Sequence, residues 1–196
     1  MIGLNQGNVQ RYCAWGRISI NVVTLILFLT LTSMTFETQA LGQEPNEPAV
    51  KAAFLFNFVK FVEWPAEAFN DGGTPIIVGV LGDDPSSSAI DQTINDKTAN
   101  GRRLVIQRFS SVKALTYCHV LFIGYSQRAN LQKILAVVGP RVLTVGETDR
   151  FAQTGGIINF IIIDHKVRFE INQTAAEKAG LRISAKLLGL SHPTKR

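Results

Sequence analysis

Cysteine and histidine are both scarce in this sequence, which has two cysteines and three histidines among 196 residues. His119, His165 and His192 lie far apart along the chain, and no His or Cys pattern has the spacing of zinc ligands. The sequence also lacks a nucleophile elbow, a P-loop and the dinucleotide-binding fingerprint. We therefore predict no catalytic residues, no metal site and no cofactor, and we favour a binding or sensing protein over an enzyme.

Charged residues are also few. They make up 18% of the chain, and the formal net charge of +5 is scattered, with no basic run except Lys195 and Arg196 at the end. Nucleic-acid binding usually needs a clustered basic surface, so no nucleic-acid partner is expected. Apolar residues make up 46% of the chain, which is typical of a globular protein, and its length fits one domain with a sizeable core.

The N-terminus carries an export signal. Arg11 and Arg17 precede residues 18–36, which contain no charge, and Thr38 and Ala40 form a small-residue cleavage site. Residues 1–40 are therefore predicted to be a cleaved signal peptide. The alternative is an uncleaved anchor, in which residues 18–36 stay in the inner membrane as the only membrane contact. Both interpretations deliver the rest of the chain outside the cytoplasm.

After cleavage, only Cys118 remains, because Cys13 leaves with the signal peptide. No intramolecular disulfide is then available. Cys118 lies in the apolar stretch "YCHVLFIG", and we predict that it is a buried free thiol that packs as a small hydrophobic residue.

Residues 41–48 contain Pro45 and Pro48 and are predicted to be a linker before a domain of residues 49–191, with a tail at 192–196. The domain opens with "KAAFLFNFVKFVEWP", whose apolar positions follow helical spacing. Pro65 is expected to end this helix. Its polar residues Asn57, Lys60 and Glu63 are three positions apart, so they are expected to form a single stripe.

Apolar strands and helices then alternate. Buried strands are predicted in "PIIVGVLG", "RRLVIQRF", "HVLFIG" and "RVLTVGE", and a hairpin in "IINFIIIDHKVRFEIN", with its turn at 164–166. Asn172 and Ser184 are expected to cap the two last helices. The pattern predicts a three-layer α/β/α sandwich whose mainly parallel sheet has five or six strands and ends in an antiparallel hairpin.

Asp83 and Asp84 follow the first predicted strand. Open α/β sheets bind ligands beyond the carboxyl ends of their strands, so this pair is a candidate small-ligand site. A helix cap by Asp84, followed by Pro85 as the first helical residue, is the structural alternative.

Three stretches together resemble the YfiR family of periplasmic regulators. They are "KAAFLFNFVKFVEWP", "CHVLFIG", and "GGIINFIIIDHKVRFEIN" followed by "AAEKAGLRISAKLLGLS", and the similarity extends over about residues 49–191. The matching positions are Asn57, Phe58, Lys60, Phe61, Glu63, Trp64, Pro65, Asn159, Phe160, Phe169, Ile171, Asn172, Leu181, Ser184, Leu187 and Leu188.

The resemblance implies a repressor that binds the periplasmic domain of a membrane-bound diguanylate cyclase, lowers cyclic di-GMP and so restrains biofilm formation. From the matching positions we select Asn57, Lys60, Glu63 and Trp64 as partner-binding residues, and homodimerisation through the same helix is a further expectation. Family members often carry disulfides, but Cys118 has no partner here, so an intramolecular redox switch is not expected. The alternative function is a periplasmic small-molecule sensor or carrier, which rests on Asp83 and Asp84.

Overall fold

The computed structural model describes residues 46–194, so the predicted signal peptide or anchor, its cleavage site and Cys13 lie outside the described residues. Within 46–194, no helix is long and apolar enough to cross a membrane. The main helices are α2 (Glu47–Phe61), α3 (Pro85–Ile94), α4 (Leu131–Val137), α5 (Gln173–Lys178) and α6 (Ala185–Leu188). Short 3-10 turns occupy Ala66–Ala68, Val112–Ala114 and Tyr125–Asn130.

One sheet of seven strands forms the centre of this domain, in the order β3-β4-β2-β5-β6-β7-β8. Its strands are β2 (Ile76–Leu81), β3 (Thr98–Ala99), β4 (Arg102–Phe109), β5 (Val120–Ile123), β6 (Leu143–Gly146), β7 (Ile158–Ile163) and β8 (Lys166–Ile171). The five strands β4, β2, β5, β6 and β7 are adjacent in this order and parallel. The edge strands β3 and β8 are antiparallel to their neighbours. The α/β class is confirmed, but the sheet is mixed and curled, and it has seven strands instead of five or six.

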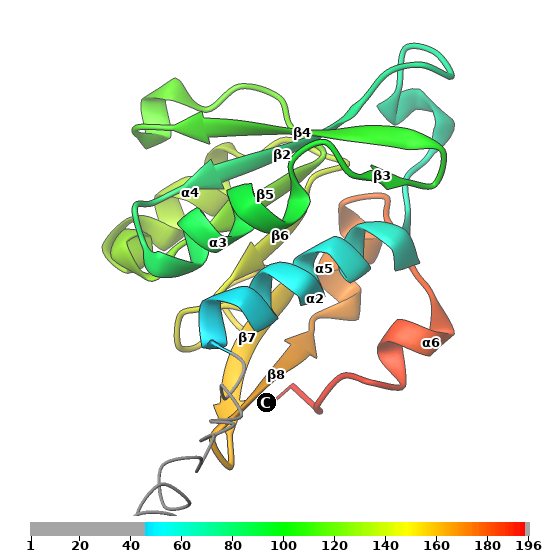
Figure 1. Cartoon of the computed structure of the whole chain (residues 1–196). Helices are drawn as coiled ribbons and strands as arrows, with labels where there is room; N and C mark the ends of the chain where they lie inside the picture. Colours follow the sequence, from blue (N-terminus) through cyan, green and yellow to red (C-terminus); the bar gives the residue numbers. More distant parts are fainter. Residues whose placement is uncertain (1–45, 195–196) are drawn as a thin grey trace, which may run out of the picture. The chain divides into compact units, whose positions relative to one another are not determined.

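Helices pack on both faces of the sheet (Figure 1). On one face, α2 and α3 share a core with residues such as Val78, Val80 and Phe122. On the other, Leu131 and Ile134 of α4 pack against alternate residues of the same strands. The alternation arises because successive side chains of a strand point to opposite faces, and it explains why these strands are apolar throughout.

Helix α2 is strongly apolar because most of its side chains pack against neighbouring elements, while one stripe that includes Ala53, Asn57 and Lys60 is exposed. Phe54 and Phe58 pack against Phe160 and Phe169 of the hairpin, with ring centroids 4.9 to 6.4 Å apart. The N-terminal boundary differs from the prediction, since Glu47 and Pro48 form the first turn of α2 and are not part of a linker.

The C-terminal boundary of α2 also differs, because the helix ends at Phe61 instead of continuing to Pro65. Val62 and Glu63 form the short strand β1 (Val62–Glu63), which pairs with β9 (Arg182–Ile183). This pairing supplies hydrogen bonds that replace the last helical turn. Glu63 therefore lies on a strand, and the predicted helical stripe through Asn57, Lys60 and Glu63 is wrong at its last member.

Other local predictions are confirmed. The side chains of Asn172 and Ser184 accept hydrogen bonds from the amides of Ala175 and Leu187 at the starts of α5 and α6. The hairpin turns at Asp164 and His165, which both have positive φ, as a tight two-residue turn requires. Cys118 is a buried free thiol, and burial raises its pKa to about 12.

Candidate functional site

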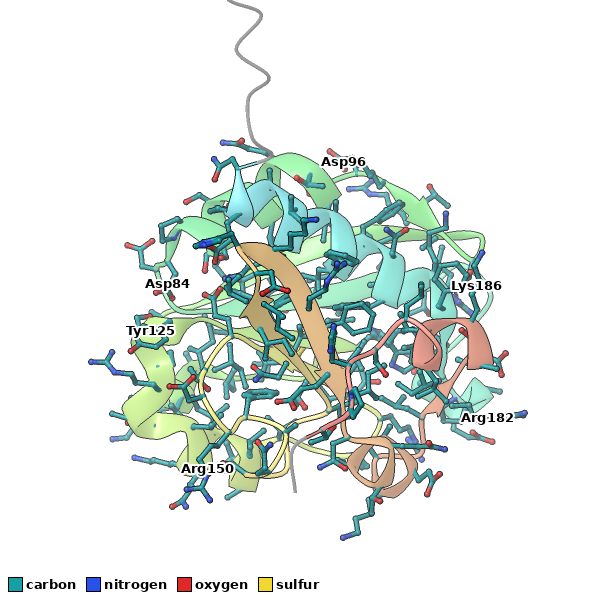
Figure 2. All side chains as sticks on the ribbon, turned by 90° about the horizontal axis from the view of Figure 1, so that it is seen from below. Asp84, Asp96, Tyr125, Arg150, Arg182 and Lys186 are labelled. Atoms are coloured by element: carbon teal, nitrogen blue, oxygen red, sulfur yellow. The ribbon has the colours of Figure 1, made fainter. Side chains whose placement is uncertain are left out.

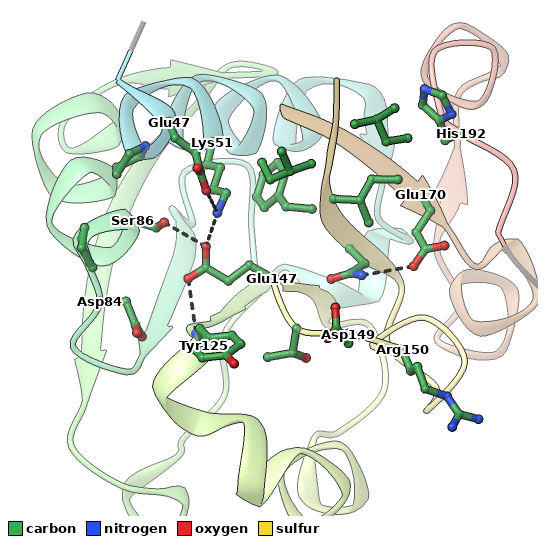
Figure 3. A pocket seen from close by; sticks show the side chains of 18 of the residues that line it. Glu47, Lys51, Asp84, Ser86, Tyr125, Glu147, Asp149, Arg150, Glu170 and His192 are labelled. Carbon is green, nitrogen blue, oxygen red and sulfur yellow. Dashed lines mark hydrogen bonds and ion pairs between the residues drawn. The ribbon is translucent and has the colours of Figure 1, made fainter. Parts of the chain in front are cut away.

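An open pocket of about 1170 Å³ lies beyond the carboxyl ends of β2, β5 and β6. Figure 2 views the domain from the side of this pocket, with Asp84, Tyr125 and Arg150 around it, and Figure 3 shows it from close by. Its walls come from the first turns of α2 and α3, the loops after β5 and β6, the hairpin β7–β8 and the C-terminal segment. Ligands commonly bind at this edge of an open α/β sheet.

A buried ion pair between Lys51 and Glu147 lines one side of the pocket. The Lys51 Nζ lies 2.7 Å from a Glu147 carboxylate oxygen and 2.6 Å from Glu47 one turn earlier on α2. The side chains of Lys51 and Glu147 are 9% and 6% exposed. Burial alone would lower the pKa of Lys51, but hydrogen bonds and attraction from Glu147 and Glu47 outweigh it and raise that pKa. Lys51 therefore carries its charge inside the protein.

Glu147 joins three elements. Besides Lys51 of α2, its carboxylate accepts hydrogen bonds from the Ser86 hydroxyl, at 2.9 Å, and from the Tyr125 backbone amide, at 3.3 Å. These donors lie at the start of α3 and in the loop after β5 (Figure 3). Three donors on one carboxylate hold the helices and the loop in place around the pocket.

Asp84 lines the pocket and stands at the N-cap position of α3, but its side chain does not cap that helix. Its carboxylate instead accepts from the Ser126 amide, at 3.0 Å, and from the Ser126 hydroxyl, at 2.8 Å. The glycine at position 124 lets the Asp84 carboxylate come this close to the chain, because a Cβ there would overlap it. Asp83 is exposed and is not among the residues that line the pocket. The structure thus separates the two aspartates that the sequence analysis grouped.

The opposite side of the pocket has a second buried carboxylate. Glu170 of β8 is 5% exposed, and one of its oxygens accepts from the Asn159 amide group, at 3.1 Å. The Asn159 carbonyl oxygen and the Thr148 hydroxyl are buried and have no hydrogen-bond partner. Both residues line the pocket, as do Phe160 and the isoleucines 161–163. Polar groups and an apolar wall therefore meet around one space.

The proposed partner-binding residues lie elsewhere, and none of them lines this pocket. Asn57 and Lys60 are exposed on α2, where the Lys60 ammonium lies over the Phe56 ring, 5.5 Å from its centroid. Glu63 is exposed on β1 and faces Arg182 at 3.9 Å. Trp64 is partly buried, and its indole N–H points at the carbonyl oxygens of Arg141 and His119, at 3.0 and 3.3 Å.

His119 has a structural role. Its Nδ1 accepts from the Ile77 amide, so Nε2 carries the proton and faces the Ala68 carbonyl oxygen at 3.0 Å. Burial lowers its pKa, which keeps the ring neutral. In residues 46–194, no group of three or more His, Cys, Asp or Glu side chains is placed to hold a metal ion.

Sequence reasoning did not find Lys51, Glu147 or Glu170. One signal was present for Glu147, because it directly follows the apolar stretch "RVLTVG", as Asp83 and Asp84 follow "PIIVGVLG". Polar residues just after parallel strands meet at one edge of the sheet. Lys51 offered no such signal, since a lysine at the start of an apolar helix usually points to solvent.

The described part of the chain thus combines an α/β sheet with a polar pocket beyond the ends of its strands, which is where open α/β sheets commonly bind ligands. The family is then given by sequence comparison, in which the YfiR/HmsC-like family matches residues 48–192. The chain belongs to this family. Membership agrees with the resemblance found in the sequence and indicates a regulatory protein, and it is consistent with a periplasmic location.

Comparison with other proteins adds support for the fold alone. A crystal structure of a conserved domain protein from Vibrio cholerae O1 biovar El Tor strain N16961 is similar, with a TM-score of 0.52 and 11% sequence identity. The similarity covers 76% of this chain and 60% of that chain. None of the curated proteins matches this chain.

Proposed function

We propose that this protein is an exported, non-enzymatic repressor that binds the periplasmic domain of a membrane-bound diguanylate cyclase. Binding holds the cyclase inactive and lowers cyclic di-GMP in the cell. The observation that carries the proposal is the family match, which extends over nearly all of the described residues.

The outer surface around α2 is the proposed contact surface. Asn57 and Lys60 are exposed there, and partly buried rings lie beside lysines, with the Lys60 and Lys97 ammonium groups 5.5 and 5.0 Å from the Phe56 centroid. Aromatic rings with a polar rim are typical of protein interfaces. Glu63 and Trp64 lie at the end of this surface, on β1 and just after it.

The test is charge reversal at Lys60. Lys60→Glu should slow association with the purified periplasmic domain of a cyclase and change its salt dependence, because charges at the rim of an interface mainly steer encounter. In cells that carry this variant in place of the native gene, cyclic di-GMP should rise toward the level of a deletion strain. The matched control is Lys133→Glu, which reverses an exposed charge on α4, on the other face of the sheet.

Two results would count against the proposal. A deletion strain whose cyclic di-GMP equals that of the wild type would remove the repressor function. A Lys60→Glu protein that binds the cyclase domain as the Lys133→Glu control does would move the contact surface away from α2, and it would leave the repressor function to be tested with other surfaces.

A second candidate function is that of a periplasmic small-molecule sensor or carrier. The pocket beyond the strand ends supports it, because buried polar groups without partners line this pocket beside an apolar wall. The two functions are compatible, since Lys51 of the pocket and Lys60 of the proposed contact surface belong to the same helix.

A further inference from the structure

The pocket described above has an excess of negative charge. Five carboxylates line it, from Glu47, Asp84, Glu147, Asp149 and Glu170, against two permanent cations, Lys51 and Arg150, and one histidine, His192. The whole chain, in contrast, has a formal net charge of +5. Lys51 is already shared between Glu47 and Glu147, so it does not offset the other carboxylates. The pocket therefore favours a positively charged occupant.

Glu170 is the carboxylate that most needs a cation. It is 5% exposed, its one hydrogen-bond donor is the Asn159 amide group, and no ion pair to it forms within residues 46–194. A buried carboxylate is costly unless it is paired with a cation and fully hydrogen-bonded. The buried oxygens of Asn159 and Thr148, which have no partner, are further acceptors next to the same pocket.

Two features of the pocket indicate an organic cation and not a metal ion. No set of three His, Cys, Asp or Glu side chains in the described part of the chain is close enough to hold a metal. The wall beside Glu170 is apolar, because Ile161 and Ile163 of β7 line the pocket and lie on the same face of the hairpin as Asn159 and Glu170. Figure 3 shows Glu147, Asp149 and Glu170 on different sides of one space. An ammonium group can donate hydrogen bonds to these acceptors, and a short aliphatic chain attached to it can pack against this wall.

We propose that the pocket binds a small aliphatic amine in its protonated form, with an ammonium group at Glu170 and its methylene chain against Ile161 and Ile163. The ammonium group supplies three donors, which match the Glu170 carboxylate and its neighbouring acceptors. A second ammonium group, as in a short diamine, meets Asp149 or Asp84 across the pocket. This inference adds a ligand class to the sensor function named above and does not depend on the cyclase.

The experiment is calorimetric titration of the purified protein with 1,4-diaminobutane at low ionic strength. Saturable binding is expected with the diamine at millimolar or lower concentrations. The uncharged analogue 1,4-butanediol and the dianion succinate should not bind under the same conditions. In methyl NMR spectra, the diamine should shift the signals of Ile161 and Ile163, which share the face of Glu170. Absence of diamine binding, or equal binding of the diol, would overturn the proposal.

Variants test the site itself. Glu170→Gln keeps the size of the side chain and should weaken diamine binding about tenfold or more, since a buried charge partner is lost. The matched control is Glu177→Gln on α5, an exposed residue outside the pocket, which should bind as the wild type does. Equal affinities of these two variants would contradict the site. If Glu170→Gln fails to fold, the exposed Asp149→Asn replaces it, with a severalfold loss expected and no loss contradicting the proposal.

Amine binding is measured without a cyclase, so the two proposals fail separately. A protein that binds the cyclase domain but not the diamine is a repressor without this ligand. A protein that binds the diamine but no cyclase domain keeps the ligand site and loses the repressor function.

Discussion

At the scale of single residues, Lys51 connects the pocket to the helix that carries the proposed contact surface. Its ammonium group lies between Glu47 and Glu147 and is nearly inaccessible to water. A charge in such a position stabilises the fold only while its partners are present, because desolvation opposes it. Loss of either partner of the Lys51–Glu147 pair is therefore expected to destabilise the domain.

We expect Lys51→Met to lower the free energy of unfolding by about 3 to 5 kcal/mol, because it leaves Glu147 buried without a cation. Urea unfolding measures this change. Lys60→Met on the exposed side of the same helix is the control and should cost no more than about 0.5 kcal/mol. The double variant Lys51→Met with Glu147→Leu should recover part of the loss. A Lys51→Met protein as stable as the Lys60→Met control would contradict the role given to the pair.

The pH dependence of this effect has a defined sign. The pKa of Lys51 in the folded protein is above its ordinary value of 10.5, so the folded state holds the proton more tightly than the unfolded state does. The stabilisation is complete below pH 10.5 and is lost as the pH rises through the higher folded value. Above neutral pH, the stability difference between wild type and Lys51→Met should accordingly stay constant up to about pH 10.5 and shrink in strongly alkaline solution.

At the scale of elements, the end of α2 is held by a strand pair and by Trp64. The β1–β9 pairing brings the end of α2 to the segment before α6, and the hydrogen bond from Ser184 N to Phe61 O extends that contact. The Trp64 indole then links this corner to the loops before β5 and β6 through two carbonyl oxygens. These contacts give Trp64 a structural role that is independent of any partner.

We expect Trp64→Phe to keep the fold and to lose about 1 kcal/mol of stability, because the ring stays and the N–H donor is lost. Trp64→Ala should cost about 3 to 5 kcal/mol through the cavity that it leaves. Thermal unfolding of both variants, together with binding to the cyclase domain, separates the two roles. A Trp64→Ala protein that retains its melting temperature but no longer binds the cyclase domain would make Trp64 an interface residue.

At the scale of the whole molecule, the described domain is expected to function outside the cytoplasm. We expect the mature protein to begin at Leu41, because Thr38 and Ala40 are the small residues that signal peptidase recognises. The intact mass of the protein in the periplasmic fraction measures this. A full-length species in the membrane fraction would instead support the anchor formed by residues 18–36.

Local sequence patterns account for the features that depend on neighbouring residues. The apolar strands, the tight turn at Asp164 and His165, the caps at Asn172 and Ser184 and the burial of Cys118 all follow from local patterns, and the structure contains them. The α/β class follows for the same reason, since alternating apolar strands and helices bury their faces in few ways. The family resemblance was readable from the same stretches.

The features that join distant parts of the chain depend on tertiary contacts. The helix ends at Phe61 because Val62 and Glu63 pair with a strand near the C-terminus, and no local pattern encodes that partner. Lys51 and Glu147 are 96 positions apart, and Asp84 bonds Ser126 across 42 positions instead of capping its own helix. The sheet brings the ends of its strands to one edge, so carboxylates that are far apart in the sequence line one pocket there. Burial at this edge makes their charges costly unless cations or hydrogen-bond donors pair with them.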